Sequence, residues 1–136
     1  MYPEELIAPM RHDLSGHGFD EVKTVAEVDA AIKAEGTTMV VINSVCGCAA
    51  ANARPAAKMA AQHSKRPDRF VTAFAGNDVE AVNHARALMA PYPPSSPSIA
   101  LFKDGKLVHM VERHHIEGRP AEMIAENLTG AFDEHC

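Results

Sequence analysis

Two cysteines separated by one residue stand where a strand-like segment gives way to a helix-like one. Residues 38–42 (TMVVI) are apolar or β-branched, and residues 49–51 begin an alanine-rich stretch. This change in composition is typical of a strand that turns directly into a helix. Cys46 and Cys48 lie at the turn, where free backbone N–H groups and the helix dipole stabilise a thiolate. Because a thiolate is the species that attacks disulfides, the position of the pair indicates thiol–disulfide chemistry.

The spacing of the two cysteines favours a reactive disulfide. With only Gly47 between them, a Cys46–Cys48 disulfide closes a smaller ring than a Cys-x-x-Cys pair does, and we expect that ring to be strained and labile. Gly47 tolerates the backbone torsions that the ring requires. Three alternatives remain open: a metal site, chiefly for a soft ion such as Cu(I), a structural disulfide, and two inert buried thiols. A zinc site is disfavoured because no spaced histidine pair accompanies the cysteines.

Size and charge restrict the fold and the partners. The 136 residues are enough for one domain, 1–136, with its own hydrophobic core. Acidic residues outnumber basic ones by 18 to 13, and the net charge of −5 opposes binding to nucleic acid. Three cysteines are too few for a disulfide scaffold, and the acidic N-terminal segment does not resemble a signal peptide. No apolar stretch approaches membrane-spanning length, so we expect a cytoplasmic location.

The hydrophobic pattern predicts an α/β sandwich in which a central mixed β-sheet is flanked by helices. Helices are expected at residues 3–10, 24–36, 48–62, 79–89 and 120–132, and strands at 38–42, 70–75, 98–102 and 107–111. Thr24 and Glu27 form a predicted capping box, and Gly36 is expected to end that helix. Pro55 either bends the helix after the cysteines or begins a second helix following a short turn. The Asp104-Gly105 pair predicts an antiparallel hairpin.

Residues 97–106 (PSIALFKDGK) resemble the segment of thioredoxin-fold proteins in which a cis-proline precedes a strand of an edge hairpin. The resemblance implies a thioredoxin-like fold, a cis Ser96–Pro97 bond, and a place for Pro97 beside the cysteine turn. Such a proline presents no N–H, and the backbone of Ser96 is then free to pair with a thiol substrate. The sequence departs from ordinary thioredoxins, since Val45 stands where they carry tryptophan and the chain contains none. A general, strongly reducing role is therefore not expected, and the short ring predicts a disulfide more oxidising than a thioredoxin's.

Longer motifs are similar to those of the bacilliredoxin family, a group of small thioredoxin-like proteins. They are residues 43–50 (NSVCGCAA), 52–56 (NARPA), 92–97 (YPPSSP), 112–118 (ERHHIEG) and the terminal Cys136. The resemblance implies an enzyme that removes bacillithiol, a low-molecular-weight thiol, from mixed disulfides on proteins, and some members are described as disulfide isomerases. It also implies bacillithiolated or disulfide-bonded client proteins as partners, bacillithiol as co-substrate, and no tightly bound cofactor.

Six residues are candidates for the site. Cys46 is expected to be the nucleophile, because it comes first at the start of the helix, and Cys48 the resolving thiol. The candidates for substrate binding are Gly47, Ser96, Pro97 and Arg54, and no residue is assigned as a metal ligand.

Arg54 and three residues outside this list need a separate interpretation. Arg54 lowers the pKa of the cysteines or binds a carboxylate of the thiol, or else it is a solvated helix arginine. His114 and His115 are expected to make local hydrogen bonds or to lie on the surface, because adjacent residues of a strand or loop point to different sides. Cys136 is expected to be a free terminal thiol. The alternative function is a non-catalytic module that binds a metal or a thiol through Cys46 and Cys48.

Overall fold

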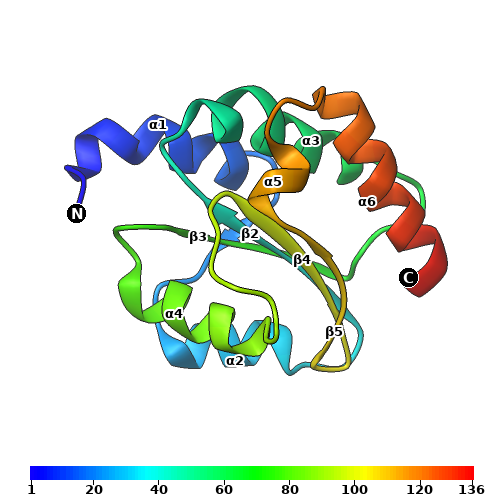
Figure 1. Ribbon diagram of the computed structural model, residues 1–136. Coiled ribbons are helices and arrows are strands. Elements are labelled where there is room, and N and C mark those ends of the chain that lie inside the picture. The colour runs from blue at the N-terminus through cyan, green and yellow to red at the C-terminus, as the bar shows by residue number, and fades with distance from the viewer.

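The computed structural model describes residues 1–136, and its centre is a five-stranded mixed β-sheet (Figure 1). The strands are β1 (Asp20–Glu21), β2 (Thr37–Asn43), β3 (Arg69–Phe74), β4 (Ser98–Lys103) and β5 (Lys106–Val111), in the spatial order β1-β3-β2-β4-β5. The helices are α1 (Glu4–Ser15), α2 (Val25–Ile32), α3 (Arg54–Ala60), α4 (Val79–Leu88), α5 (Arg113–Ile116) and α6 (Ala121–His135), and a π-helical segment, η1 (Ala49–Ala53), precedes α3. The predicted sheet flanked by helices is confirmed.

The central strand is β2, which is buried over its whole length. It pairs with β3 in parallel and with β4 in antiparallel orientation, so that Val41 lies between Thr72 and Ile99. A strand covered on both faces is expected to be apolar throughout, which is the pattern of residues 38–42. The cysteine turn leaves the carboxyl end of this strand, between the ends of its two neighbours.

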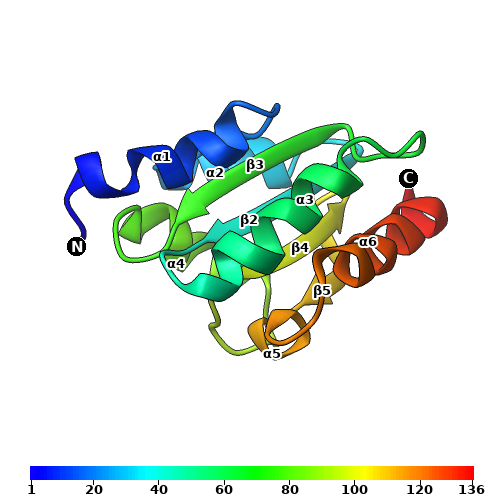
Figure 2. The same ribbon diagram turned by 90° about the horizontal axis from the view of Figure 1, so that it is seen from above.

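Helices cover both faces of the sheet (Figures 1 and 2). Because side chains alternate along a strand, Met39 and Val41 pack toward α3 and α6, whereas Val40 and Ile42 pack toward α2 and α4. Figure 2 looks down on α1, α3 and α6, with α2 behind the sheet. The two apolar clusters hold the sheet between them and fix the position of the turn after β2.

Two local predictions are confirmed. The Oγ1 of Thr24 accepts a hydrogen bond from the Glu27 N–H at 3.1 Å, and the Glu27 carboxylate accepts one from the Thr24 N–H at 3.1 Å, which completes the capping box. β4 and β5 form an antiparallel hairpin through Asp104 and Gly105, whose φ angles are 51° and 82°. Positive φ at both central residues is the requirement of the hairpin turn that Asp-Gly predicts.

The helix after the cysteines agrees in part with the second alternative for Pro55, because α3 begins at Arg54 with Pro55 in its first turn, although the segment before it is π-helical and not a simple turn. The chain stays helical from η1 into α3 and ends at Ala60, not at residue 62. In η1 the Arg54 N–H donates to the carbonyl of Ala49, five residues earlier, instead of the usual four. A wider turn here leaves room for Pro55, which has no N–H and whose ring crowds the preceding turn. The proline therefore produces a π-helical segment rather than a break.

Other boundaries differ from the prediction in ways that packing explains. α1 continues past Pro9 to Ser15 because Ile7 and Leu14 are both fully buried. α2 ends at Ile32, since Gly36 belongs to the following turn, where its N–H donates to the Asp104 carboxylate at 2.8 Å. α6 runs on to His135, three residues further than predicted. The two elements without a predicted counterpart, β1 and α5, have two and four residues, too few to show a period. None of the helices is long and apolar enough to cross a membrane.

Candidate functional site

The two cysteines lie at the start of the helical segment that follows β2. Cys46 and Cys48 are joined by a disulfide with their Cα atoms 5.4 Å apart, and both are half-buried while Gly47 between them is exposed. The Cys46 carbonyl accepts hydrogen bonds from the N–H groups of Ala49 and Ala50, at 3.0 and 3.3 Å. Cys46 thus precedes the first helical turn, where the helix dipole and free N–H groups favour a thiolate. This position agrees with the prediction from the strand-to-helix change in composition.

Asn43 and Ser44 hold the cysteine turn through hydrogen bonds, and neither was predicted as a site residue. The Ser44 N–H donates to the Asn43 side-chain oxygen at 2.8 Å, and the Cys46 N–H donates to the Ser44 hydroxyl at 3.1 Å. The Asn43 amide also donates to the Met10 carbonyl at 3.0 Å, which ties the turn to α1. Asparagine and serine that directly follow a strand often bind nearby backbone groups, and this signal was available in the sequence.

Arg54 lies beneath the turn and is only 5% exposed. Its Nη1 donates to the Asn43 side-chain oxygen at 3.2 Å and to the Ser44 carbonyl at 3.3 Å. Its Nε is 3.2 Å from the Asp13 carboxylate, an ion pair without hydrogen-bond geometry. Burial lowers the pKa of the guanidinium, and Asp13 acts in the opposite direction. The alternative of a solvated helix arginine is therefore wrong.

The Ser96–Pro97 segment lies at the same edge of the sheet as the cysteine turn. The Ser96–Pro97 bond is cis, as the resemblance implied. Ser98 is paired with Ile42, so Pro97 lies opposite the last residue of β2. The Ser96 N–H makes no hydrogen bond within the protein, but its carbonyl accepts one from Nη1 of Arg113 at 3.2 Å. The Ser96 N–H is therefore unpaired, as expected, whereas its carbonyl already accepts one of the two hydrogen bonds that a carbonyl oxygen can accept.

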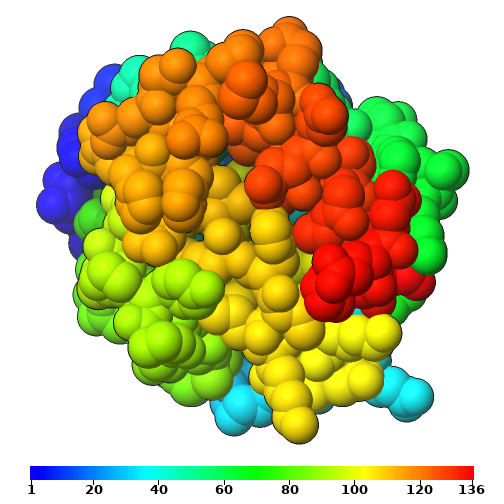
Figure 3. Space-filling view, turned by 45° about the vertical axis from the view of Figure 1, so that its right-hand side comes forward, coloured from blue at the N-terminus to red at the C-terminus, as the bar shows by residue number.

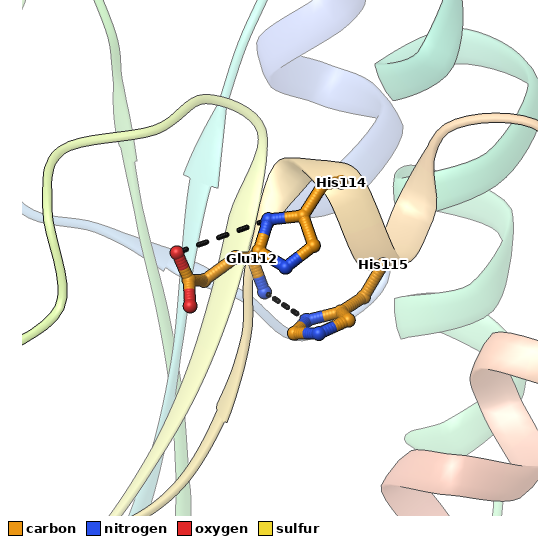
Figure 4. Close-up of side chains that lie close together, drawn as sticks. All are labelled: Glu112, His114 and His115. Carbon is orange, nitrogen blue, oxygen red and sulfur yellow. Dashed lines mark hydrogen bonds and ion pairs between the residues drawn. The ribbon is translucent and has the colours of Figure 1, made fainter.

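The paired histidines lie in α5 and not in a strand or loop. In this helical turn the rings of His114 and His115 are neighbours, with centroids 4.0 Å apart, which corrects the expectation that they point to different sides (Figure 4). Glu112 joins them in a group whose possible metal-ligand atoms lie within 4.8 Å of one another. The group contains neither cysteine of the turn.

The geometry of this group is that of a helix cap. The Glu112 N–H donates to Nδ1 of His115 at 3.2 Å (Figure 4). The Glu112 side chain accepts from the His115 backbone N–H, which completes the cap. Burial lowers the pKa of His115, and the neighbouring His114 adds to this effect. His114 is exposed and lies 3.9 Å from the Glu112 carboxylate. These contacts fix α5, whose Arg113 in turn holds the Ser96 carbonyl.

Cys136 lies at the other end of the sheet from the cysteine turn. It is a free, exposed cysteine beside Thr37, the first residue of β2. Burial of the sulfur raises the pKa of the thiol, and a hydrogen bond with Thr37 opposes this change. The length of β2, about 20 Å at 3.3 Å per residue, separates this thiol from the turn after Asn43. The expectation of a free terminal thiol is confirmed.

Comparison with known proteins decides the family. The sequence model of the family described as disulphide isomerase matches residues 2–136. A bacilliredoxin from Cytophaga hutchinsonii is 59% identical over 98% of this chain and 99% of its own length. A second, from Halalkalibacterium halodurans, is 51% identical over 99% of this chain and 94% of its own. This chain belongs to the bacilliredoxin family.

The likeness to solved structures confirms the thioredoxin-like fold. Mitochondrial thioredoxin 3 from Saccharomyces cerevisiae, in its oxidised form, superposes with a TM-score of 0.61 at 16% identity, over 90% of this chain and 98% of that one. The bacilliredoxin relatives, the fold and the Cys46–Cys48 disulfide together identify a thiol–disulfide oxidoreductase.

Proposed function

We propose that this bacilliredoxin removes bacillithiol from mixed disulfides on client proteins. The observation that carries the proposal is the Cys46–Cys48 disulfide at the start of a helix, with Cys46 ahead of the first helical turn. The names of the relatives support bacillithiol as the thiol. The reaction draws on a pool of reduced low-molecular-weight thiol, so we place the protein in the cytoplasm.

The first step transfers bacillithiol to Cys46. The Cys46 thiolate attacks the bacillithiol sulfur of the mixed disulfide, the new Cys46–bacillithiol bond forms, and the bond to the client sulfur breaks. The client cysteine leaves as a thiolate and takes up a proton. The Ser44 hydroxyl accepts a hydrogen bond from the Cys46 N–H and so fixes the backbone that carries the attacking sulfur. The helix dipole favours the thiolate form of that sulfur.

The second step releases bacillithiol and oxidises the protein. The Cys48 thiolate attacks the Cys46 sulfur, the Cys46–Cys48 bond forms, and bacillithiol leaves as a thiolate that takes up a proton. Client and bacillithiol together gain the two electrons that the dithiol loses. This step forms the same Cys46–Cys48 bond that the structure contains. Two further low-molecular-weight thiols return the dithiol: the thiolate of the first opens the Cys46–Cys48 bond to form a mixed disulfide, and the second attacks the sulfur of that bound thiol, so that the two leave as their own disulfide.

The remaining candidates act on the substrate or on the turn. The unpaired N–H of Ser96 is available to a backbone carbonyl of the client, and Pro97 adds no competing donor. Gly47 has no atom within 4 Å of the place where a Cβ would stand, so the substrate can approach the turn from this side. Arg54 faces Ser44 from below, which supports an effect on the cysteines more than direct contact with a substrate.

Mass spectrometry of the intact proteins tests the order of the steps. The reduced protein is mixed with a bacillithiolated client, and we expect the wild type to end as the Cys46–Cys48 disulfide with free bacillithiol. Cys48→Ser should accept bacillithiol on Cys46 and retain it, whereas Cys46→Ser should accept none. Cys136→Ser is the matched control, because it removes a thiol outside the site and should behave as the wild type. An active Cys46→Ser variant would contradict the assignment.

Disulfide isomerase activity is a second proposed function, and the description of the matching family supports it. Recovery of activity from a client with scrambled disulfides measures it directly, and we expect Cys46→Ser to abolish that recovery.

The alternative, a non-catalytic metal- or thiol-binding module, predicts that protein purified under reducing conditions carries a bound ion. Elemental analysis that finds one ion per chain, released when the cysteines are oxidised, would favour the module.

A further inference from the structure

A cavity of about 330 Å³ opens between β5, α5 and α6 (Figure 3). Figure 3 shows this face, which is hollowed where β5 (yellow) meets the orange segments of α5 and the start of α6. Its polar lining comes from His115, Arg119 and Asn127, and its apolar lining from Met110, Val111, Met123 and Ile124. A volume near 300 Å³ with an apolar wall and a few polar groups is typical of sites for small molecules.

The cavity lies close to the cysteine turn. The side-chain amide of Asn52 donates a hydrogen bond to the Arg119 carbonyl, and Asn52 is four residues after Cys48. Asn52 lies in η1, which begins directly after Cys48, so about one helical turn separates the second cysteine from the residue that binds Arg119. On the other side, Arg113 binds the Ser96 carbonyl. The cavity is therefore within the reach of a small molecule whose sulfur is at Cys46.

The charges at the cavity favour an anion. Arg119 is exposed, and its guanidinium makes neither an ion pair nor a hydrogen bond within the protein. No acidic side chain lines the cavity. The Asn127 side-chain oxygen is held by Nε2 of His109 at 2.7 Å, which leaves the amide group of Asn127 free to donate. An unpaired guanidinium next to amide and imidazole groups suits a carboxylate, which accepts two parallel hydrogen bonds from arginine.

We propose that this cavity binds the carboxylate-bearing part of the low-molecular-weight thiol while the sulfur of that thiol reacts at Cys46. The inference rests on the proposed function and adds a specificity site to it. Arg119 binds the carboxylate, Asn127 donates a second hydrogen bond, and the apolar wall contacts the carbon skeleton. The free Arg119 side chain thus distinguishes an anionic thiol from a neutral one.

Binding is tested without the redox reaction by NMR titration with S-methyl bacillithiol, which keeps the carboxylates and cannot exchange. We expect the largest amide shifts at Val111, Arg119 and Asn127, and their loss in Arg119→Gln. Lys106→Gln, at the tip of the β4–β5 hairpin, is the matched control and should bind as the wild type does. Shifts confined to other surfaces would overturn the proposal, as would a cavity that responds only to a peptide of the client protein.

Single-turnover kinetics test the specificity. One client is prepared in two forms, with bacillithiol or with cysteamine, a thiol without a carboxylate, on the same cysteine. We expect Arg119→Gln to slow removal of bacillithiol about tenfold or more and to leave removal of cysteamine unchanged, because a hydrogen bond to a charged group is worth about that much. The specificity site would be contradicted if Arg119→Gln removed bacillithiol as fast as the wild type does. Equal slowing of Arg119→Gln with bacillithiol and with cysteamine would also contradict it.

The two experiments separate this proposal from the proposed function. If S-methyl bacillithiol shifts the cavity residues but the wild type removes no bacillithiol from a client, the proposed function fails and the site stands. If the wild type removes bacillithiol and the cavity residues do not respond, the function stands and the site is wrong.

Discussion

Two arginines are almost fully buried in this protein, and they are neutralised to very different degrees. Arg11 of α1 is 8% exposed and donates five hydrogen bonds, at 2.7 to 3.1 Å, to the carboxylates of Glu4, Glu21 and Asp78. The hydrogen bonds that the Arg11 guanidinium donates to Asp78 raise the pKa of the guanidinium. Arg54 of α3 is 5% exposed, and its one close carboxylate is that of Asp13. Burial lowers the pKa of Arg54.

The difference follows from what each arginine holds together. Arg11 joins α1, β1 and the loop before α4, and its carboxylates cancel its charge several times over. Arg54 shares Asp13 with Lys58, whose Nζ is 2.5 Å from that carboxylate, so its own charge is less completely cancelled. A buried cation whose charge is incompletely cancelled favours an anion nearby. Arg54 is linked to the cysteine turn through Ser44, whose carbonyl accepts from Arg54 and whose hydroxyl accepts from the Cys46 N–H. One arginine therefore stabilises the fold, and the other is suited to stabilise a thiolate.

Replacing Arg11 should have the largest effect on stability. Arg11→Met removes the cation and leaves Asp78, which is 7% exposed, as a buried charge without its partner. We expect the free energy of unfolding, measured with urea, to fall by about 3–5 kcal/mol, the usual cost of breaking a buried pair. The exposed Arg66→Met is the control and should lie within about 0.5 kcal/mol of the wild type. The pH dependence of Cys46 alkylation should stay unchanged, and a shift would remove the contrast between the two arginines.

The carboxylate of Asp78 should make stability depend on pH. Burial alone would raise its pKa, but hydrogen bonds from Arg11 and from the Phe74 N–H outweigh burial and lower it below the usual value. The unfolded chain takes up the proton first, near pH 3.9, so the stabilisation is complete above that pH and is lost as the pH falls through the lower folded pKa. We expect Asp78→Asn to reduce stability at pH 7 by about 2–3 kcal/mol and to flatten the acid limb of the stability curve. An unchanged acid limb would contradict the role of Asp78.

Features that depend on residues close together in the sequence could be predicted. The strand at 38–42, the Asp104-Gly105 hairpin and the capping box at Thr24 depend on residues close in sequence, and all three are confirmed. The position of the cysteine pair is of the same kind, because composition on either side of it marks the end of a strand and the start of a helix. Local pattern was thus enough for most of the fold and for the centre of the site.

Contacts between distant residues could not be predicted in this way. Arg11 and Asp78 are 67 positions apart, and in the sequence each looks like an ordinary surface charge. The cavity between β5, α5 and α6 depends on how these elements pack together and on a four-residue helix that has no period to detect. Arg54 was recognised as a candidate, but its burial depends on α1 packing over the turn, which no local signal shows.

Replacing Arg54 should cost less stability than replacing Arg11 but should change the chemistry of the turn. Arg54→Met removes the Nη1 donor of the Ser44 carbonyl and leaves the Asn43 side-chain oxygen with only the Ser44 N–H, while Asp13 keeps Lys58. We expect a loss of about 2 kcal/mol in the free energy of unfolding. The pH midpoint for alkylation of Cys46 by iodoacetamide should rise, because the thiolate loses a nearby cation. Arg54→Lys should restore part of that shift, and a midpoint equal to that of Arg11→Met would show that Arg54 is structural only.

Replacing Cys136 should have the smallest effect of all. Cys136→Ser changes an exposed side chain at the end of the chain, and serine can keep the hydrogen bond with Thr37. We expect the free energy of unfolding to change by less than about 0.5 kcal/mol and the transfer of bacillithiol to be unaffected. The contrast with Cys46 is one of position, because the two thiols lie at opposite ends of β2 and only one stands at the start of a helix. If Cys136→Ser trapped the Cys46–bacillithiol adduct, Cys136 would be a resolving thiol, and the sheet would have to bring its two ends together during turnover.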